Sequence, residues 1–577
     1  MNPAAHPQLS LRLPQWRTRF VLLLLVAAFA ALGGRAFYLQ GLHHDFLQAK
    51  GESRYGRTLE ISAHRGMITD RHGEPLAIST PVESVWAVPA DAQLSAEQQR
   101  QLAAILEIEP LELARRLADH TRDFTYLKRQ LPPSRAALVV QMDLPGVFLR
   151  REYRRYYPAG ETLAHVVGFT DVDDKGQEGL ELALQDQLAG RPGSRRVIRD
   201  RLGHVVEDVA SIRAPQQGHD LALAIDLNLQ YLAYRELKNA MEQHQAKAGG
   251  IVVLDVKTGE VLALANLPTY NPNNRSGYNA VRGRNRAIVD LFEPGSTMKP
   301  FTVAAAIESG MVSPQTIIPT AGGMLTIGAK TIRDSHANGN LTVSQVIQKS
   351  SNVGTARMAL AMPPQRLWAM LSASGFGTDP HSGFPGEAGG RLRDYHTWRP
   401  IEQATISFGH GISVSLMQLS RAYTIFCNDG QLLPLSMIRR DGPATGTPVI
   451  SRQTAATLRD MLQLVTEPGG TAKKAAVDGY STAGKTGTAR KLINGQYSSD
   501  RYIASFVGFA PASDPRLLVA VMIDEPSAGQ YYGGEVAAPV FSTVMSGALR
   551  LMSIKPDLPV GRKGRGSDDG QVPREDV

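Results

Sequence analysis

Residues 249–267 read GGIVVLDVKTGEVLALANL, and this stretch decides the fold of the C-terminal part of the chain. Two apolar runs of strand length flank the turn Lys257-Thr258-Gly259, a pattern typical of a β-hairpin. Two further apolar runs, at 502–512 and 516–526, come near the other end of this part. Helical patterns occupy much of 297–470 between them. Strands at both ends with helices between them predict a central antiparallel sheet covered by helices on both faces.

The hairpin lies inside a larger unit that we place at residues 221–552. It opens with LALAIDLNLQYLAYRELKNAMEQH (221–244), which reads as a strand followed by an amphipathic helix. The preceding residues, 40–220, mix short strands, glycine turns and helical stretches, and are predicted to form an elongated α/β module. Residues 553–577 are rich in Gly, Pro and charge, which predicts a disordered tail. The predicted fold class is α+β.

The N-terminal stretch RTRFVLLLLVAAFAALGGRAFYLQ predicts a membrane anchor. Residues 20–39 are apolar apart from Arg35, and about 20 residues cross a bilayer. Arg17 and Arg19 precede the run, which favours a cytoplasmic tail at 1–19 and an exported body. The alternative is a cleaved signal peptide, because Ala28-Phe29-Ala30 resembles a cleavage site. Since the apolar pattern continues past Ala30, we favour the uncleaved anchor.

Composition excludes some functions. The 62 Lys and Arg exceed the 54 Asp and Glu only slightly, and no nucleic-acid motif accompanies the excess, so we expect no nucleic-acid partner. An anionic surface such as membrane or cell wall is compatible with it. Cys427 is the single cysteine, so no internal disulfide forms. The histidines lack metal-ligand spacing, and we expect no metal.

Three short motifs carry candidate chemistry. Ser296 and Lys299 form the one Ser-x-x-Lys of the chain, and lie at i and i+3 after Pro294-Gly295. On a helix they share a face, as a nucleophile and its base would. Ser350-Ser351-Asn352 is the one Ser-x-Asn, and Lys485-Thr486-Gly487 begins a predicted edge strand that could flank a cleft. The second Lys-Thr-Gly, in the 249–267 hairpin, is assigned no role because its glycine serves the turn.

The order of the three motifs is the signature of penicillin-binding proteins and serine β-lactamases. The chain further resembles the class B penicillin-binding proteins, especially the septal transpeptidases of Gram-negative bacteria (the penicillin-binding protein 3 group). The resemblance runs from the anchor to about residue 552. It implies that 40–220 is a non-catalytic pedestal or dimerisation-like module and that 221–552 is the transpeptidase domain. The stretches that carry it include RGMITDRHGEPLA, RRYYPAGETLAHVVGFTD, RNRAIVDLFEPGSTMKPF, KSSNVG and YYGGEVAAPVF.

The residues of the motifs suit acyl transfer. Ser296 needs a base, and Lys299 can serve only when neutral, a state that burial and the neighbouring cation Lys485 would favour. Ser350 can relay a proton to the departing amine, while Asn352 would hold substrate amides and Lys299. Three further roles are expected: Lys485, Thr486 and Thr488 bind a peptide carboxylate, Gly487 admits substrate to the strand, and, as the family implies, the backbone N–H groups of Ser296 and Thr488 form the oxyanion hole.

Other positions have a structural alternative. His410, in SFGHGIS, stands where the family usually has an aromatic residue, and we interpret it as a packing residue that leaves β-lactam preference open. Tyr531 and Tyr532 match aromatics that wall the family's cleft, or are surface strand residues. Arg65, Asp70 and Arg71 of the N-terminal module could be recognition residues, and we favour a structural ion-pair network. Glu161 and Glu181 are assigned no catalytic role.

The resemblance implies a membrane-anchored peptidoglycan D,D-transpeptidase that cross-links septal stem peptides ending in D-Ala-D-Ala through an acyl-serine, is inhibited by β-lactams and needs no cofactor. It would lie in the inner membrane, with a periplasmic catalytic domain, beside a glycan polymerase and other division proteins. The alternatives are an elongation enzyme of the same class, a β-lactamase, and a penicillin-binding scaffold or receptor. No glutamate between Asn352 and Lys485 has the asparagine four residues later that class A β-lactamases use, which counts against the second alternative.

Overall fold

The computed structural model describes residues 15–43, 56–61, 63–199, 205–493 and 495–559. An N-terminal helix, α1 (Gln15–Phe37), continues into a π-helical turn (Tyr38–Leu42). An 18-residue window within these 28 residues has a mean hydropathy of 2.2. Within the described ranges this is the one helix that is long and apolar enough to cross a membrane. Residues 1–14, which make up most of the predicted cytoplasmic tail, lie outside the described residues.

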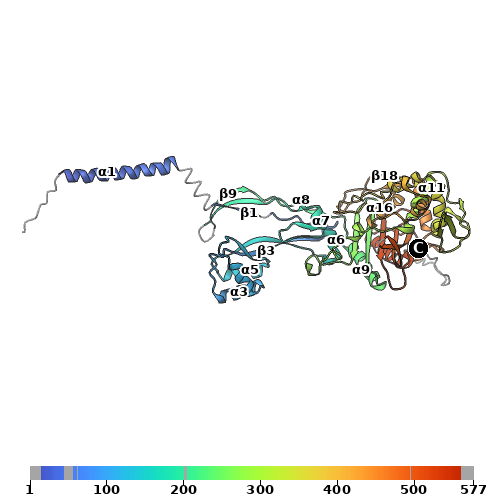
Figure 1. Cartoon of the computed structure of the whole chain (residues 1–577), viewed down its shortest axis with the longest axis horizontal. Helices are drawn as coiled ribbons and strands as arrows, with labels where there is room; N and C mark the ends of the chain where they lie inside the picture. The colour runs from blue at the N-terminus through green and yellow to red at the C-terminus, as the bar shows by residue number, and fades with distance from the viewer. Residues whose placement is uncertain (1–14, 44–55, 62, 200–204, 494, 560–577) are drawn as a thin grey trace, which may run out of the picture. The chain divides into compact units, whose positions relative to one another are not determined.

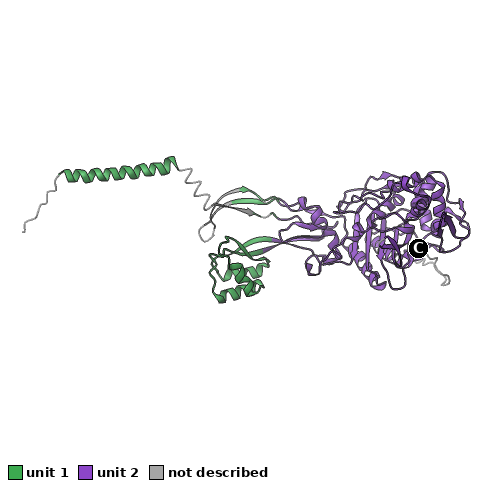
Figure 2. Ribbon diagram, viewed as in Figure 1, with its two compact units in different colours: residues 1–63, 83–152, 191–216 green, residues 64–82, 153–190, 217–577 purple. Residues whose placement is uncertain are grey.

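The chain divides into two compact units (Figure 2). Unit 1 holds residues 1–63, 83–152 and 191–216, and unit 2 holds 64–82, 153–190 and 217–577. Segments 64–82 and 153–190, which the sequence places in the N-terminal module, therefore cluster with the C-terminal part. The five ranges predicted from the sequence divide the chain differently, and their boundaries stay predictions.

Unit 1 has two small substructures (Figure 1). One is an antiparallel three-stranded sheet in the order β1-β8-β9. The other packs three helices against β4 around a core of leucines that includes Leu102, Leu106, Leu113 and Leu127. The elements are β1 (Gly56–Ile61), β8 (Gly193–Arg199), β9 (Val205–Arg213), α3 (Ala96–Leu106), α4 (Pro110–Leu117), β4 (Thr125–Leu131) and α5 (Pro133–Gln141).

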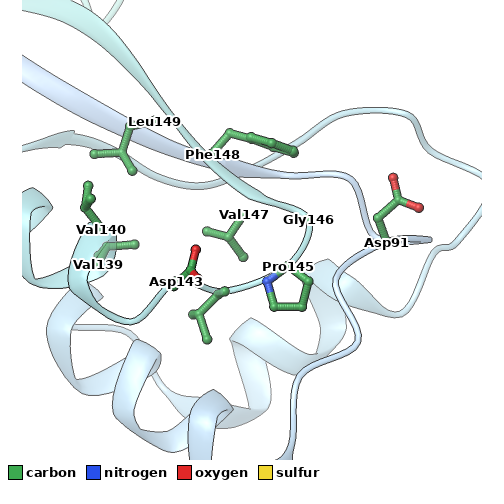
Figure 3. Close-up of a pocket in the computed structure, with 10 residues that line it drawn as sticks. Asp91, Val139, Val140, Asp143, Pro145, Gly146, Val147, Phe148 and Leu149 are labelled. Atoms are coloured by element: carbon green, nitrogen blue, oxygen red, sulfur yellow. The ribbon is translucent and has the colours of Figure 1, made fainter. Parts of the chain in front are cut away.

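Local sequence explains the helices of unit 1. Ser95 caps α3 through a reciprocal capping box with Gln98, and Pro110 begins α4 at a position where its missing N–H costs nothing. A mostly apolar pocket of about 480 Å³ lies at the end of α5, where Val140, Pro145 and Phe148 line it (Figure 3). Strands β3 (Pro75–Ala87) and β5 (Val147–Tyr156) contribute residues to both units.

Unit 2 is built on an antiparallel five-stranded sheet in the order β12-β11-β21-β20-β19. This confirms the predicted hairpin (β11 and β12) and the pairing of first and last strands, since β11 lies between β12 and β21. β19, which carries Lys485-Thr486-Gly487, is the edge strand, as predicted. The bounds are β11 (Ala248–Asp255), β12 (Val261–Leu267), β19 (Ala483–Ile493), β20 (Gln496–Ala510) and β21 (Leu517–Asp524).

Helices cover both faces of this sheet. Gly249 and Gly250 are neighbours on β11 and therefore face opposite sides. A Cβ on Gly249 would lie 2.8 Å from Leu237 of α9, whereas one on Gly250 would lie 3.5 Å from Leu416 of α16. The helices of unit 2 with eight or more residues are α9 (Leu227–Gln243), α11 (Lys299–Glu308), α13 (Asn352–Ala361), α14 (Pro364–Ala373), α16 (Leu416–Cys427), α17 (Arg452–Gln463) and α19 (Ala538–Leu551).

Short elements complete unit 2. β2 pairs in parallel with β10 and antiparallel with β3, which joins residues near 68 to residues near 221. The short helices and strands are β2 (Ile68–Thr69), α6 (Ala164–Val167), β6 (Phe169–Thr170), β7 (Gly176–Glu178), α7 (Gly179–Ala183), α8 (Gln185–Leu188), β10 (Leu221–Ala222), α10 (Arg286–Val289), β13 (Ile317–Ile318), β14 (Met324–Ile327), β15 (Lys330–Arg333), β16 (Leu341–Thr342), α12 (Val343–Gln348), α15 (Pro400–Ile406), β17 (Gln431–Leu432), β18 (Thr447–Pro448) and α18 (Gly533–Val536).

A buried ion-pair cluster joins the short elements of unit 2. Both carboxylate oxygens of Glu181 accept hydrogen bonds, at 2.7 Å from Nε of Arg65 and at 2.6 Å from Nε of Arg155. All three side chains are at most 1% exposed. The expected network thus includes Arg65, but its acid is Glu181. Asp70 instead accepts backbone N–H bonds from residues that include His72, at 2.7 Å.

Residues at the start of the range predicted to be a disordered tail make hydrogen bonds to unit 2. Asp557 accepts hydrogen bonds from the backbone N–H of Ser481 at 2.8 Å and from the hydroxyl of Ser513 at 2.6 Å. The backbone N–H of Leu558 donates to the carbonyl of Gly479 at 3.0 Å. Residues 553–559 are therefore held against the loops before β19 and between β20 and β21, and their polar composition hid these contacts. Residues 560–577 lie outside the described residues.

Candidate active site

The nucleophile candidate lies in a tight turn at the start of α11. Residues Gly295–Met298 form a 3₁₀ turn, and the backbone N–H of Lys299 donates to the carbonyl of Ser296. Side chains at i and i+3 eclipse each other in a 3₁₀ helix, so Ser296 and Lys299 share a face more directly than an α-helix would allow. Ser296 is 3% exposed and Lys299 is fully buried. Among the described residues, the Ser296 hydroxyl makes no hydrogen bond.

The two lysines of the motifs meet on one hydroxyl. Nζ of Lys299 donates to Oγ of Ser350 at 3.1 Å and to the Ser350 carbonyl. Nζ of Lys485 donates to the same Oγ at 2.9 Å. Both lysines are fully buried, and Ser350 is 1% exposed. Three motifs separated by up to 189 positions along the chain, from Ser296 to Lys485, therefore converge on one hydrogen-bonded group.

Ser350 occupies a strained position between two helices. Its φ is +60°, in the left-handed region, where a non-glycine residue costs about 1–2 kcal/mol. The next residue, Ser351, caps α13 by accepting from the N–H of Gly354, and its hydroxyl donates to Asp334 at 2.6 Å. Asp334 also accepts from the N–H of Val353. These bonds hold the turn that presents Ser350 to the two lysines.

Asn352 is placed differently from the prediction. Its amide Nδ2 donates to the carbonyl of Arg333 at 3.2 Å. No hydrogen bond joins it to Lys299 among the residues that the structure describes. Asn352 lies in the first turn of α13 and is 7% exposed, so its amide oxygen remains available for a substrate amide.

The Lys-Thr-Gly strand lies against the nucleophile turn. A Cβ on Gly487 would lie 2.8 Å from the carbonyl of Pro294, so only glycine permits this approach. Lys485 also donates to Oγ1 of Thr486 at 3.2 Å, and this hydroxyl is paired with Thr471 at 3.0 Å. Thr488 is 1% exposed, and its hydroxyl accepts from the N–H of Gly533 at 3.0 Å.

Tyr531 and Tyr532 precede Gly533 and so border Thr488. The two hydroxyls are 3.1 Å apart, and the ring of Tyr531 stacks on Tyr502 of β20 at 4.1 Å. They lie in a loop before α18 and not in a strand. The structure therefore places both tyrosines next to the carboxylate-binding candidates.

Four residues that support the site carried no motif. The hydroxyl of Tyr423, on α16, donates to the carbonyl of Thr297 at 2.7 Å and so holds the nucleophile turn against this helix. Asp334 and Thr471 hold Ser351 and Thr486 as described. The fourth is Gly409, whose carbonyl accepts from the N–H of Gly295 at 3.2 Å. Only the glycine left a signal in the sequence, as part of the repeated Gly in SFGHGIS.

Gly409→Ala should distort the nucleophile turn. Gly409 has φ +90°, and an added Cβ would lie 2.1 Å from the carbonyl oxygen of Gly295. Gly383 is the matched control, because it has φ +85° but nothing within 4 Å of its Cβ position. Both alanines pay about 1–2 kcal/mol of backbone strain, and overpacking at 409 adds about 1–3 kcal/mol. We expect a lower unfolding temperature and slower β-lactam acylation for Gly409→Ala; equal values in the two variants would contradict the close approach.

His410 packs beside the site as a neutral side chain. Its ring lies 5.4 Å from that of Phe408 and 6.0 Å from that of Tyr497. Nδ1 is buried and has no hydrogen-bond partner among the described residues. Burial, and secondly the charge of Lys299, lower the pKa of His410 to about 4.

The free energy of unfolding should therefore decrease as the pH is lowered, because of His410. Between pH about 6.5 and 4 the histidine is protonated in the unfolded chain but neutral in the native state. The contribution of His410 to the free energy of unfolding is therefore complete above pH about 6.5 and is lost as the pH falls toward 4. We expect the unfolding temperature to drop less between neutral pH and pH about 5 in His410→Phe than in the wild type. Part of the drop remains, because burial lowers the pKa of His165 to about 4 as well. Identical drops would show that His410 is not held neutral.

A serine beside a buried lysine, with a second lysine and a hydroxyl between them, is the arrangement of a serine acyltransferase. Family models agree with this class. Residues 249–546 match the penicillin-binding protein transpeptidase domain, and residues 60–223 match the penicillin-binding protein dimerisation domain.

Two curated proteins are similar to the chain along most of its length. The chain is 45% identical to the probable peptidoglycan D,D-transpeptidase PenA of Neisseria gonorrhoeae, over 94% of both chains. It is 43% identical to the peptidoglycan D,D-transpeptidase FtsI of Escherichia coli, over 94% of this chain and 93% of that protein. The solved transpeptidase domain of Burkholderia pseudomallei penicillin-binding protein 3 superposes with a TM-score of 0.55 at 46% identity, covering 58% of this chain and 98% of that one.

The protein therefore belongs to the penicillin-binding protein transpeptidase family, and within it to the class B proteins that join a dimerisation module to the transpeptidase domain. Its relatives and its apolar N-terminal helix mark it as a candidate single-pass inner-membrane protein.

Proposed function

We propose that the protein is a peptidoglycan D,D-transpeptidase that cross-links stem peptides of the septal wall through an acyl-enzyme at Ser296. The observation that supports this most strongly is the sharing of the Ser350 hydroxyl by Lys299 and Lys485, at 3.1 and 2.9 Å, next to the Ser296 turn. This geometry allows each of these side chains a role in acyl transfer.

Acylation begins at the Ser296 hydroxyl. Lys299, in its neutral form, takes the proton as Oγ of Ser296 attacks the carbonyl carbon of the D-Ala-D-Ala bond. The charge of Lys485 and the buried surroundings favour a neutral Lys299. Negative charge on the carbonyl oxygen is met by the backbone N–H groups of Ser296 and Thr488.

Collapse of the intermediate breaks the C–N bond. The proton that Lys299 took from Ser296 passes through the Ser350 hydroxyl to the leaving amine, so Ser350 and Lys299 return to their starting states and D-alanine departs. The terminal carboxylate is bound by Lys485 with the hydroxyls of Thr486 and Thr488, and Asn352 holds the peptide amide with its free oxygen. An amine of a neighbouring strand then attacks the Ser296 ester, and this step forms the cross-link and restores the hydroxyl. Tyr531 and Tyr532 wall the carboxylate end.

The remaining assignments follow from the class. The N-terminal helix anchors the protein in the inner membrane with its N-terminus cytoplasmic and its catalytic domain periplasmic, and Arg17 and Arg19 support this orientation. A glycan polymerase and other division proteins are the proposed partners. A tagged copy should form bands at the septum; a dispersed wall pattern would indicate the elongation enzyme instead.

A β-lactamase activity is the weaker candidate. The three glutamates between Asn352 and Lys485 accept hydrogen bonds from nearby residues: Glu387 from Ser382, Glu402 from Arg393 and Arg399, and Glu467 from Gln463. Rapid stopped-flow turnover of a chromogenic cephalosporin would overturn the transpeptidase assignment.

The direct test of the proposal uses the full-length protein in detergent. With a pentapeptide ending in D-Ala-D-Ala and an amine acceptor, it should release D-alanine and form a cross-linked product, and penicillin should block both. Covalent penicillin binding without either product would favour the receptor alternative.

A further inference from the structure

A loop outside the three motifs reaches both sides of the active site. It lies between α17 and β19, reads VTEPGGTA and is called the 465–472 loop below. Two backbone bonds of 2.9 Å close it on itself, one from the N–H of Ala472 to the carbonyl of Val465 and one from the N–H of Gly470. A Cβ on Gly470 would lie 2.2 Å from the Val465 carbonyl oxygen, so this compact form requires a glycine.

This loop is tied to the segments that carry two of the motifs. On the helical side, Nζ of Lys349, the residue before Ser350, donates to the carbonyl of Gly469 at 2.9 Å. On the sheet side, the hydroxyl of Thr466 donates to the carbonyl of Thr482, just before β19, at 2.7 Å. The loop therefore joins the turn of the Ser-x-Asn motif to the strand of the Lys-Thr-Gly motif.

Thr471 brings a hydroxyl from this loop to the Lys-Thr-Gly strand. Its Oγ1 lies 3.0 Å from Oγ1 of Thr486. Thr471 is 2% exposed, and within the described ranges Thr486 is the one hydrogen-bond partner of its hydroxyl. The carbonyl of Thr471 lies against α18, because a Cβ on Gly534 would be 2.3 Å from this oxygen. The hydroxyl is therefore held in a buried position beside β19.

The direction of the bond between the two threonines follows from what each proton can reach. If Thr471 accepted this bond, its own proton would be buried without an acceptor, which is unfavourable. Thr471 is therefore the donor. The ammonium group of Lys485 can only donate, so its 3.2 Å contact with Oγ1 of Thr486 is a second bond that this oxygen accepts. Both lone pairs of the Thr486 oxygen are then occupied, and its own proton is left for a third group.

We propose that Thr471 is a positioning residue that presets the Thr486 hydroxyl as a donor to the terminal carboxylate of the substrate; this role rests on the proposed function. A hydroxyl whose two lone pairs are occupied presents its proton in one direction, so no reorientation is needed when the carboxylate binds. A bond from this hydroxyl to an anion is also stronger than one between neutral groups. Thr471 acts through Thr486 and not on the substrate itself.

The test measures acylation of the full-length protein by two substrates. One is an N-acyl-D-alanyl thioester that ends in a carboxylate, and the other has a methyl group in place of this carboxylate. Thr471→Val keeps the shape of the side chain and removes the hydroxyl. We expect kcat/KM for the carboxylate substrate to fall about tenfold, which corresponds to about 1.4 kcal/mol, and kcat/KM for the methyl substrate to stay unchanged. Thr471→Ser keeps the hydroxyl and should retain both wild-type values.

A double-mutant cycle separates this role from simple packing. Thr486→Val removes the hydroxyl through which Thr471 acts, so adding Thr471→Val to it should cause no further loss with the carboxylate substrate. Thr543→Val is the matched control, because Thr543 is an exposed threonine of α19, and it should change neither value.

Three results would overturn the proposal: an equal loss for both substrates in Thr471→Val, no loss for either, or additive losses in the double variant. A tenfold loss in Thr471→Ser would contradict it as well, because the hydroxyl is still present. If neither thioester acylates the wild-type protein, the proposed function fails instead, whatever the role of Thr471.

Discussion

Lys299→Met should slow acylation of Ser296 by a β-lactam about a thousandfold, the scale of a lost general base. Methionine keeps the length of the stem in a fully buried position but removes the amine that donates to Ser350. The Ser296 proton then has no acceptor in the turn, and the Ser350 hydroxyl keeps only Lys485 as a donor. The rate constant for fluorescent penicillin labelling measures the effect.

Lys257→Met is the control for this substitution, because it changes a lysine of the second Lys-Thr-Gly. Lys257 is 40% exposed and pairs with Asp514 on the surface, so its loss should leave the labelling rate unchanged. A wild-type rate in Lys299→Met would contradict the assignment of Lys299 as the base. Unfolding temperatures of both variants confirm that the comparison is made on folded protein.

Glu181→Gln should destabilise the folded protein by about 3–5 kcal/mol, the cost of removing one partner of a buried ion pair. The Glu181 carboxylate forms ion pairs with two guanidinium groups, those of Arg65 and Arg155, and all three side chains are at most 1% exposed. The amide leaves two buried positive charges uncompensated. Asp174 does not replace this carboxylate, because Arg65 donates to the backbone carbonyl of Asp174 and not to its side chain.

The midpoint of chemical denaturation measures this loss. Asp514→Asn breaks an exposed pair of the same unit, in which Asp514 is 75% exposed, and should shift the midpoint little. Equal midpoints for the two variants would show that the Glu181 cluster contributes no more than a surface ion pair.

Local pattern was enough to predict the sheet and the chemistry. The hairpin at 249–267 is specified by two apolar runs and a Gly259 with φ +70°, so its residues alone define it. The three motifs were found because each needs fixed residue types at fixed spacing. Their meeting on Ser350 could be expected only from the family resemblance, since no periodicity links residues 135 positions apart.

Other features depend on distant partners that leave no local signal. Residues 64–82 join unit 2 through contacts such as the N–H of Leu221 with the carbonyl of Met67. The left-handed Ser350 and the carbonyl bond of Asn352 are consequences of tertiary packing around Asp334 and Arg333.

Peptide mapping after penicillin treatment tests most directly whether Ser296 is the nucleophile. We expect one penicilloyl adduct, on the peptide that contains Ser296, and no adduct on Ser296→Ala. An adduct on a different residue, or labelling that persists in Ser296→Ala, would contradict it.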